Sequence, residues 1–88
     1  MSIRDKNSDM YFLIDSGADV SVLLLTSSSM PATGTLVAAN GSKINTYGAK
    51  TITLDFSVFV VEHSFLLADV PRPILGADFF AKHSLLIN

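Results

Sequence analysis

One short motif in this sequence, Asp15-Ser16-Gly17, has the residue types for acid–base chemistry. Two apolar runs of high β propensity, residues 12–14 and 20–25, flank it, so we expect the Asp15 carboxylate in a tight turn between two strands. A carboxylate is costly to bury unless hydrogen-bond donors surround it, and small neighbours such as Gly17 would expose backbone N–H groups close to it. Asp, Ser and Gly also build ordinary solvent-facing turns, so the tripeptide alone leaves both interpretations open.

A second motif, Ile74-Leu75-Gly76, lies close to the other end of the chain. The proline-containing stretch 71–73 holds the chain extended before it, and residues 77 to about 83 predict the one convincing helix after it. Gly76 would permit a sharp entry into this helix, whose Phe79 and Phe80 are predicted to pack inward. From its residues alone, the segment is a strand, a turn and a helix.

The elements that must position these motifs are short strands. A first hairpin is predicted from residues 2–4 and 10–14, and a second over about 36–48, where Asn40-Gly41 favours a type I′ turn. An ordinary surface hairpin and a mobile flap over a bound peptide both fit the second one. Several short strands with frequent turns indicate an all-β barrel or sandwich. Further strands are predicted at 51–56, 58–61, 64–68 and 85–88, with a bend at Glu62-His63.

The composition limits the possible classes of protein. A chain of 88 residues forms one domain, 1–88, and its 49% hydrophobic residues exclude a disordered tail. The net charge of −2 gives no basic surface for nucleic acid, and the absence of cysteine excludes disulfides, thiol catalysis and thiolate metal sites. The charged N-terminus lacks the apolar stretch of a signal peptide, and no run has membrane-spanning length. We therefore expect a cytoplasmic protein with no membrane or nucleic-acid partner.

The ordered set of two motifs and an intervening hairpin resembles the retropepsins, the aspartic proteases of retroviruses and long-terminal-repeat retrotransposons. Asn40 follows Asp15 by about the interval that separates the flap tip from the catalytic Asp in that family. The sequence around Ala39-Asn40-Gly41 and from Ile74 to Phe80 looks most like that of Gypsy-type retrotransposon proteases. The resemblance covers nearly the whole chain.

The resemblance implies a mostly antiparallel, closed β-barrel of the retropepsin type with one short helix, and a homodimer. Two Asp15 carboxylates would meet on the two-fold axis and activate one water for hydrolysis of a peptide or polyprotein, with no cofactor and no metal. Asp15, Ser16 and Gly17 would be the catalytic residues, with the Ser16 hydroxyl bracing the two loops across the axis. The residues implied to bind substrate are Ala18, Asp19, Val37, Ala38, Ala39, Asn40, Gly41, Arg72 and Ile74, and those at the dimer interface are Ser16, Leu85, Leu86, Ile87 and Asn88.

The sequence departs from the family at two places. Many viral members have an Arg after the Gly of the second motif, paired with the residue that matches Asp19; here Ala77 stands there, and Arg4 is a candidate replacement cation. The chain also starts almost at the first hairpin, so the interface would rest mainly on residues 85–88 and the active-site loops. Either dimerisation is weak or the sequence is a piece of a longer polyprotein.

Two other functions stay open: an inactive or domesticated copy that only dimerises or binds peptides, and an unrelated β adaptor that binds peptides along a sheet edge. His63 and His83 are far apart in sequence and lack neighbouring ligand types, so surface or helix-end roles are expected for them rather than metal binding. The serine run 27–29 lacks a nearby His base, which argues against a serine nucleophile. Arg72, matched to the family, would edge a substrate pocket and favour polar or acidic substrate side chains.

Overall fold

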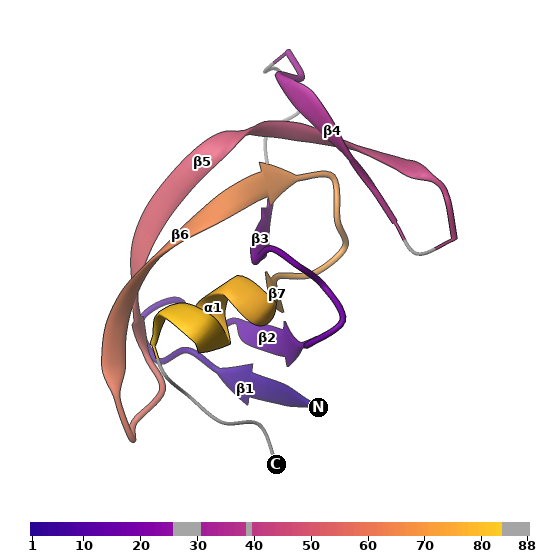
Figure 1. Cartoon of the computed structure of the whole chain (residues 1–88). Coiled ribbons are helices and arrows are strands. Elements are labelled where there is room, and N and C mark those ends of the chain that lie inside the picture. The colour runs from indigo at the N-terminus through magenta and orange to yellow at the C-terminus, as the bar shows by residue number, and fades with distance from the viewer. Residues whose placement is uncertain (26–30, 39, 84–88) are drawn as a thin grey trace.

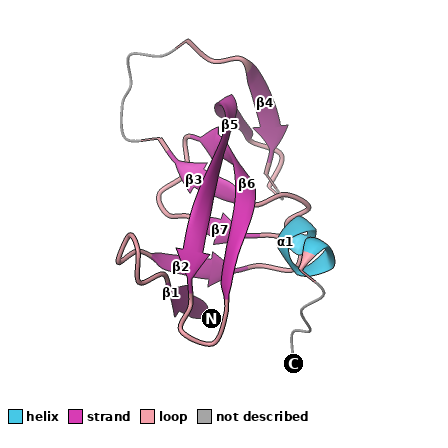
Figure 2. Ribbon diagram, turned by 90° about the vertical axis from the view of Figure 1, so that its left-hand side faces the viewer, coloured by secondary structure: helices cyan, strands magenta, loops and turns pink. Residues whose placement is uncertain are grey.

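A computed structural model describes residues 1–25, 31–38 and 40–83 of the chain as a β-rich fold with one short helix (Figures 1 and 2). Figure 2 shows the helix α1 at one side of the strands. In chain order the elements are β1 (Ser2–Arg4), β2 (Tyr11–Ile14), β3 (Val22–Leu24), β4 (Gly34–Val37), β5 (Lys43–Asp55), β6 (Val60–Ala68), β7 (Ile74–Leu75) and α1 (Ala77–Lys82).

The seven strands form one sheet in the order β1-β2-β7-β3-β6-β5-β4. Neighbouring strands are antiparallel except for the parallel pairs β2–β7 and β3–β6, so the predicted mostly antiparallel arrangement is confirmed. The predicted closed barrel is not, because within the described ranges no hydrogen-bonded pairing joins β1 to β4. The long β5 and β6 curve around the shorter strands instead, which covers the core without closing the sheet (Figure 1).

The strand β6 corrects two predictions made from the sequence. It runs unbroken through Glu62 and His63, where a bend between two strands was predicted. Its neighbour β5 likewise joins the second arm of the flap hairpin and the strand predicted at 51–56 into one long strand, which ends at Asp55. Glu62 and Ser64 are exposed while His63 and Phe65 are buried, so the strand keeps its two-residue alternation with a histidine on the inner face. The two-strand interpretation treated the polar pair as a turn, although only one of its side chains faces solvent.

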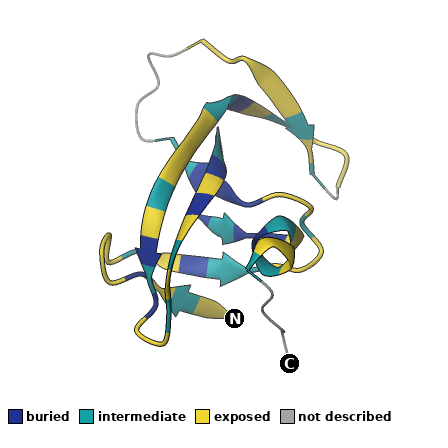
Figure 3. Cartoon of the chain, turned by 60° about the vertical axis from the view of Figure 1, so that its left-hand side comes forward, coloured by how far each residue is buried: buried dark blue, intermediate teal, exposed yellow. Residues whose placement is uncertain are grey.

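Aromatic and leucine side chains from distant parts of the chain fill the core. Phe12, Leu54, Phe65 and Phe79 have no exposed surface, and Phe80 packs against them from the edge (Figure 3). The predicted inward packing of the helix is therefore confirmed. Phe79 is the one fully buried residue of the helix, and it fixes the helix against the sheet close to the second motif.

A buried carboxylate, Asp5, organises the turn between β1 and β2. It is 1% exposed, and its oxygens accept hydrogen bonds from the backbone N–H groups of Asn7, Ser8 and Asp55, at 2.8 to 3.2 Å, and from the Ser8 hydroxyl at 2.7 Å. Burial alone would raise the pKa of Asp5, but these donors together lower it. The Asp5 side chain thus connects the turn to the end of β5, where the Lys6 N–H also donates to the Asp55 carbonyl at 2.8 Å.

We expect Asp5→Ala to lower the free energy of unfolding by about 3 kcal/mol, because three backbone donors lose a charged acceptor. Since the folded-state pKa of Asp5 lies below the unfolded value, its contribution is present above the unfolded pKa and is lost as pH falls through the folded one. Urea denaturation at neutral and acidic pH measures both effects. Asp9→Asn is the control: the Asp9 side chain is 75% exposed and, among the described residues, its ion pair is with Arg4, so its loss is expected to leave stability nearly unchanged. Equal stability of the two variants would contradict the assignment to Asp5.

Candidate active site

The structure brings the two sequence motifs together. The strands β2 and β7 pair in parallel, with Leu13 opposite Ile74 and Ile14 opposite Leu75, and the backbone N–H of Asp15 donates to the Leu75 carbonyl at 3.0 Å. Residues 15–21, hereafter the Asp15 loop, then leave β2 and lead into β3. The first motif therefore begins at the backbone of the second.

Asp15 lies in a tight turn that faces solvent. Its Oδ1 accepts the Gly17 N–H at 3.1 Å, and its carbonyl accepts the Ala18 N–H at 3.1 Å. Asp15, Ser16 and Gly17 are all exposed, and a Cβ on Gly17 would lie 3.3 Å from the Asp15 carboxylate. The geometry is an Asx-type turn that fixes the carboxylate at the surface, as the interpretation of a solvent-facing turn expects.

The start of α1 holds the Asp15 loop from the other side. The N–H groups of Ala77 and Asp78 donate to the carbonyls of Ala18 and Asp19, at 2.7 and 3.3 Å. Gly76 makes this approach possible: a Cβ there would lie 2.6 Å from the Val20 carbonyl oxygen and 2.8 Å from that of Ala18. Gly76 has an extended backbone conformation that any residue can adopt, so a glycine is needed here for close contact rather than for an unusual φ.

A buried hydrogen-bond network behind the loop was not predicted from the sequence. The Ser21 hydroxyl, in a residue 1% exposed, accepts the Gly76 N–H at 2.9 Å and donates to Asp78 Oδ1 at 2.7 Å. On the other carboxylate oxygen, Asp78 Oδ2 lies 3.2 Å from His63 Nε2. Because Ser21 is buried and donates to the carboxylate rather than to the imidazole, these residues do not form a serine-nucleophile triad.

The predicted surface role of His63 is therefore wrong, while that of His83 at the helix end is confirmed. His63 is 3% exposed, and its Nδ1 lies 3.1 Å from Nε2 of His83, the residue that caps α1. Burial and the neighbouring His63 lower the pKa of His83. Burial would raise the pKa of Asp78, but hydrogen bonds from Ser21 and His63 lower it below its ordinary value. The inward side of the β6 alternation was the one signal in the sequence for this burial.

The hairpin of β4 and β5 is present where the flap was predicted, and Figure 1 shows it projecting beyond the rest of the sheet. Its turn differs from the prediction: the Gly41 N–H donates to the Ala38 carbonyl at 2.9 Å, so the turn closes one residue earlier than a type I′ turn on Asn40-Gly41. Gly41 has φ +85°, which suits the residue after such a turn. Val37 is 71% exposed and Asn40 is exposed at the tip, while Ala39 lies outside the described residues.

The base of the hairpin is attached to the loop before β7. The Tyr47 hydroxyl donates to Asp69 Oδ2 at 2.7 Å, and this hydrogen bond raises the pKa of Tyr47. The Asp69 N–H donates to the Asn45 carbonyl at 3.1 Å. Next to this contact the β5–β6 register shifts between Thr46 and Ala49, and Gly48 has φ +91°. The two hydrogen bonds to Asp69, next to this irregular segment of β5, give the hairpin a defined base.

The other predicted site residues differ in exposure. Arg72 is exposed just before β7, Ile74 is half-buried, and Asp19 is exposed in the Asp15 loop. Arg4 forms its ion pair with Asp9, so the suggested replacement pair with Asp19 is not formed within the described part of this chain. The interface residues Leu85, Leu86, Ile87 and Asn88 and the serine run 27–29 lie outside the described residues.

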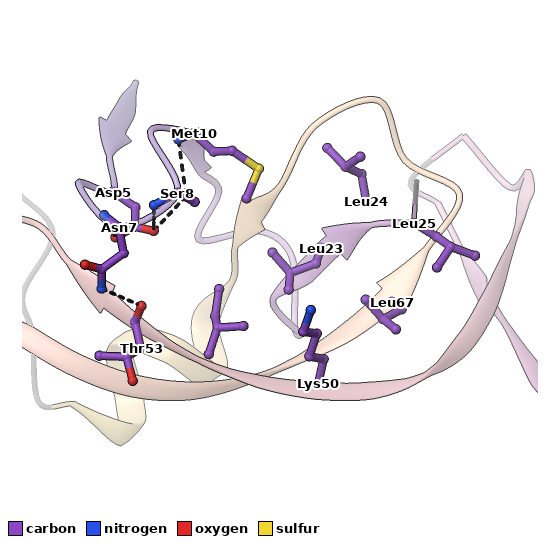
Figure 4. Close-up of a pocket in the computed structure, with 11 residues that line it drawn as sticks. Asp5, Asn7, Ser8, Met10, Leu23, Leu24, Leu25, Lys50, Thr53 and Leu67 are labelled. Carbon is purple, nitrogen blue, oxygen red and sulfur yellow. Dashed lines mark hydrogen bonds between the residues drawn. The ribbon is translucent and has the colours of Figure 1, made fainter. Parts of the chain in front are cut away.

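A cavity of about 420 Å³ opens elsewhere, between the β1–β2 turn, β3 and the middle of β5 (Figure 4). The predicted site residues are not among its lining. Its walls are mainly leucine side chains, with Lys50 on one side and Asp5 and Asn7 at one end. No cluster of His, Cys, Asp or Glu suited to a metal ion occurs among residues 1–25, 31–38 and 40–83, and the helix described there is too short to cross a membrane.

Comparison with known proteins places this geometry in a class. The chain matches a solved structure, the EIAV protease complexed with the inhibitor HBY-793, with a TM-score of 0.71 and 21% identity, over 100% of this chain and 89% of that one. The fold is therefore that of a retroviral protease. The Gag-Pol polyprotein of Koala retrovirus is 40% identical over 73 residues, which are 81% of this chain and 4% of the polyprotein. The predicted recognition as a retropepsin-type domain is thus confirmed, although no family model matches.

The chain spans only a small part of that polyprotein, so the activities of the whole polyprotein are not transferred to it. The resemblance to Gypsy-type retrotransposon proteases in particular remains a prediction.

Proposed function

We propose that this chain is an aspartic endopeptidase that acts as a homodimer on extended peptides, and that it processes a retroelement polyprotein in the cytoplasm or within a particle. The observation that carries the proposal is the position of Asp15: an exposed carboxylate in a turn fixed by Leu75, Gly17 and the start of α1. A catalytic group held by backbone hydrogen bonds on two sides is preorganised for chemistry.

Hydrolysis by this route needs two carboxylates and one water, and the chain has one Asp-Ser-Gly motif. A second copy related by a two-fold axis supplies the other Asp15. Two carboxyl groups that close share one proton, so one is a base and the other an acid. The ionised Asp15 removes a proton from the water as its oxygen attacks the peptide carbonyl carbon, and the protonated Asp15 gives its proton to the carbonyl oxygen. The C–N bond then breaks as the leaving nitrogen takes a proton.

The remaining residues have the roles that the resemblance to the retropepsins implies. Ser16 braces the two loops across the axis, and Gly17 lets the substrate backbone approach the carboxylates. The flap residues Val37 to Gly41 cover the bound peptide and exclude water, while Asp19 contacts substrate main chain near the rim. Ile74 and Arg72 line a substrate pocket, and the cation of Arg72 favours acidic or polar substrate side chains.

The test is cleavage of a mixed library of unstructured peptides over a wide range of protein concentration. For a dimeric enzyme, activity per chain rises with concentration below the dimer dissociation constant and then becomes constant. Activity per chain that is independent of concentration, with a monomer by analytical ultracentrifugation, would contradict the dimeric site. Dimers that cleave nothing at any concentration would identify a peptide-binding or dimerisation module instead. Comparison with Arg72→Ala tests the pocket: an unchanged set of cut sites would remove its specificity role.

The contact at the flap base gives a smaller prediction. We expect Tyr47→Phe to raise KM about threefold with little change in kcat, because the hairpin loses one hydrogen bond to Asp69 while Asp15 is untouched. Steady-state kinetics on one cleaved library peptide measures it. Tyr11→Phe is the matched control, since Tyr11 is exposed on β2 and far along the chain from the hairpin. Equal KM values for both variants would show that the Tyr47–Asp69 contact does not hold the flap.

A further inference from the structure

We propose that His63 on β6 is a positioning residue that holds the Asp15 loop through the carboxylate of Asp78. The expected effect of His63 on peptide cleavage rests on the proposed function, whereas its expected effect on the stability of the Asp15 loop does not. His63 touches neither the loop nor its carboxylate directly. It acts through the network of Asp78, Ser21 and Gly76, which no sequence pattern indicated.

Packing against aromatic side chains orients the ring of His63 independently of its contact with Asp78. The ring makes T-shaped contacts with Phe65 and Phe79, with ring centroids 5.2 and 5.0 Å away and interplanar angles of 82° and 74°. The residue is 3% exposed, so water does not compete for its polar atoms. A buried imidazole held edge-on by two aromatic rings has a defined direction for its hydrogen bonds.

The proton positions follow from the partners. Nε2 faces Asp78 Oδ2 at 3.2 Å, and a carboxylate accepts, so Nε2–H is the donor. Nδ1 faces His83 Nε2 at 3.1 Å and accepts from that ring. Both nitrogens of His63 therefore have partners, and His63 is the only residue of β6 whose side chain is hydrogen-bonded to Asp78 among the described residues.

Asp78 connects His63 to the Asp15 loop. Its Oδ1 accepts from Ser21, whose hydroxyl also accepts the Gly76 N–H, so the far end of the loop is attached to the second motif. The backbone N–H of Asp78 donates to the Asp19 carbonyl. One carboxylate thus links three segments, and His63 sets the orientation of its second oxygen. Oδ1 is also held by the Phe79 N–H at 2.8 Å, so loss of the His63 donor leaves Oδ2 without its partner on β6 and loosens the carboxylate that Ser21 contacts.

The experiment uses the whole chain and two readouts. His63→Leu keeps an apolar side chain between Phe65 and Phe79 but removes the donor, and His63→Gln restores an N–H that can reach Asp78. We expect His63→Leu to increase amide hydrogen exchange at Gly76 and Ala77 by about tenfold and to lower kcat about tenfold, with a smaller change in KM. His63→Gln is expected to reverse most of the increase in exchange and most of the decrease in kcat. His83→Leu is the matched control, because it leaves the Asp78 contact in place.

A double-mutant cycle separates positioning from general loss of packing. If His63 and Ser21 both act through Asp78, the combined effect of His63→Leu and Ser21→Ala on exchange at Ala77 is smaller than the product of their separate effects. Unchanged exchange at Gly76 and Ala77 in His63→Leu, or no rescue by His63→Gln, overturns the proposal whether or not the protein cleaves peptides. Faster exchange in His63→Leu, together with a wild-type chain that cleaves nothing, would support the positioning role while refuting the peptidase.

Discussion

Asp15→Asn is expected to abolish peptide cleavage, with kcat/KM lower by about 10⁴-fold or more. The amide cannot take a proton from water at neutral pH, so a dimer with two Asn side chains has neither the base nor the shared proton. The fold is expected to persist, because the Asn side-chain oxygen can still accept the Gly17 N–H that Asp15 accepts now. Cleavage of one library peptide measures the loss, and an unchanged thermal unfolding midpoint shows that the fold is kept.

Mixing the variant with the wild-type chain gives a sharper version of this experiment. If each active dimer needs one Asp15 from each chain, an equal mixture that exchanges freely keeps about one quarter of the wild-type activity at the same total concentration. A monomeric enzyme would keep about one half, since each wild-type chain would work alone. Substantial activity in Asp15→Asn by itself would contradict the assignment of Asp15 as the catalytic carboxylate.

Gly76→Ala is expected to have the second largest effect, lowering the free energy of unfolding by about 3 kcal/mol and kcat by about 10²-fold. The added methyl group would lie 2.6 and 2.7 Å from the carbonyl oxygen and carbon of Val20, and 2.8 Å from the Ala18 oxygen. All three are backbone atoms that cannot turn aside, so α1 and the Asp15 loop must separate. The hydrogen bond from Ala77 to Ala18 is lost with that separation.

Gly48→Ala is the matched control for Gly76→Ala. Gly48 has φ +91°, but a Cβ there would have no atom within 4 Å. The control therefore measures backbone strain alone, expected at about 1 kcal/mol, without displacing the active-site loop. Urea denaturation at one protein concentration compares the two variants. If Gly76→Ala is no less stable than Gly48→Ala, the close approach does not determine the need for glycine at 76.

The parts of the site that sequence analysis predicted are those encoded by local patterns. The apolar runs around Asp15 and before Gly76 predicted the strands β2, β3 and β7, although β3 begins two residues later than expected because Ser21 belongs to the loop. The hairpin of β4 and β5 and the short helix were also predicted from neighbouring residues. Each of these features depends on alternation, turn residues or helix signals within about ten positions.

The errors have a common physical cause. Glu62-His63 looks like a turn because both residues are polar, yet the partner that satisfies His63 is Asp78, on another element. The turn of the flap was placed one residue late because Asn-Gly suits several turns, and the paired strands determine which one forms. The barrel was expected to be closed, but closure depends on pairing between β1 and β4, which are distant in sequence and separate in the sheet.

The sequence by itself determined the two motifs, their order, the hairpin between them and the resemblance to the retropepsins, because these are properties of neighbouring residues. Only the tertiary structure decided that the Asp15 N–H donates to the Leu75 carbonyl and that Gly76 is needed for close contact with the Asp15 loop. It also decided that Ser21 contacts Asp78, 57 positions away along the chain. Buried polar groups find partners wherever the fold brings donors and acceptors together. Such pairings are fixed by packing of the whole domain, so the network behind the Asp15 loop was visible only once the chain had folded.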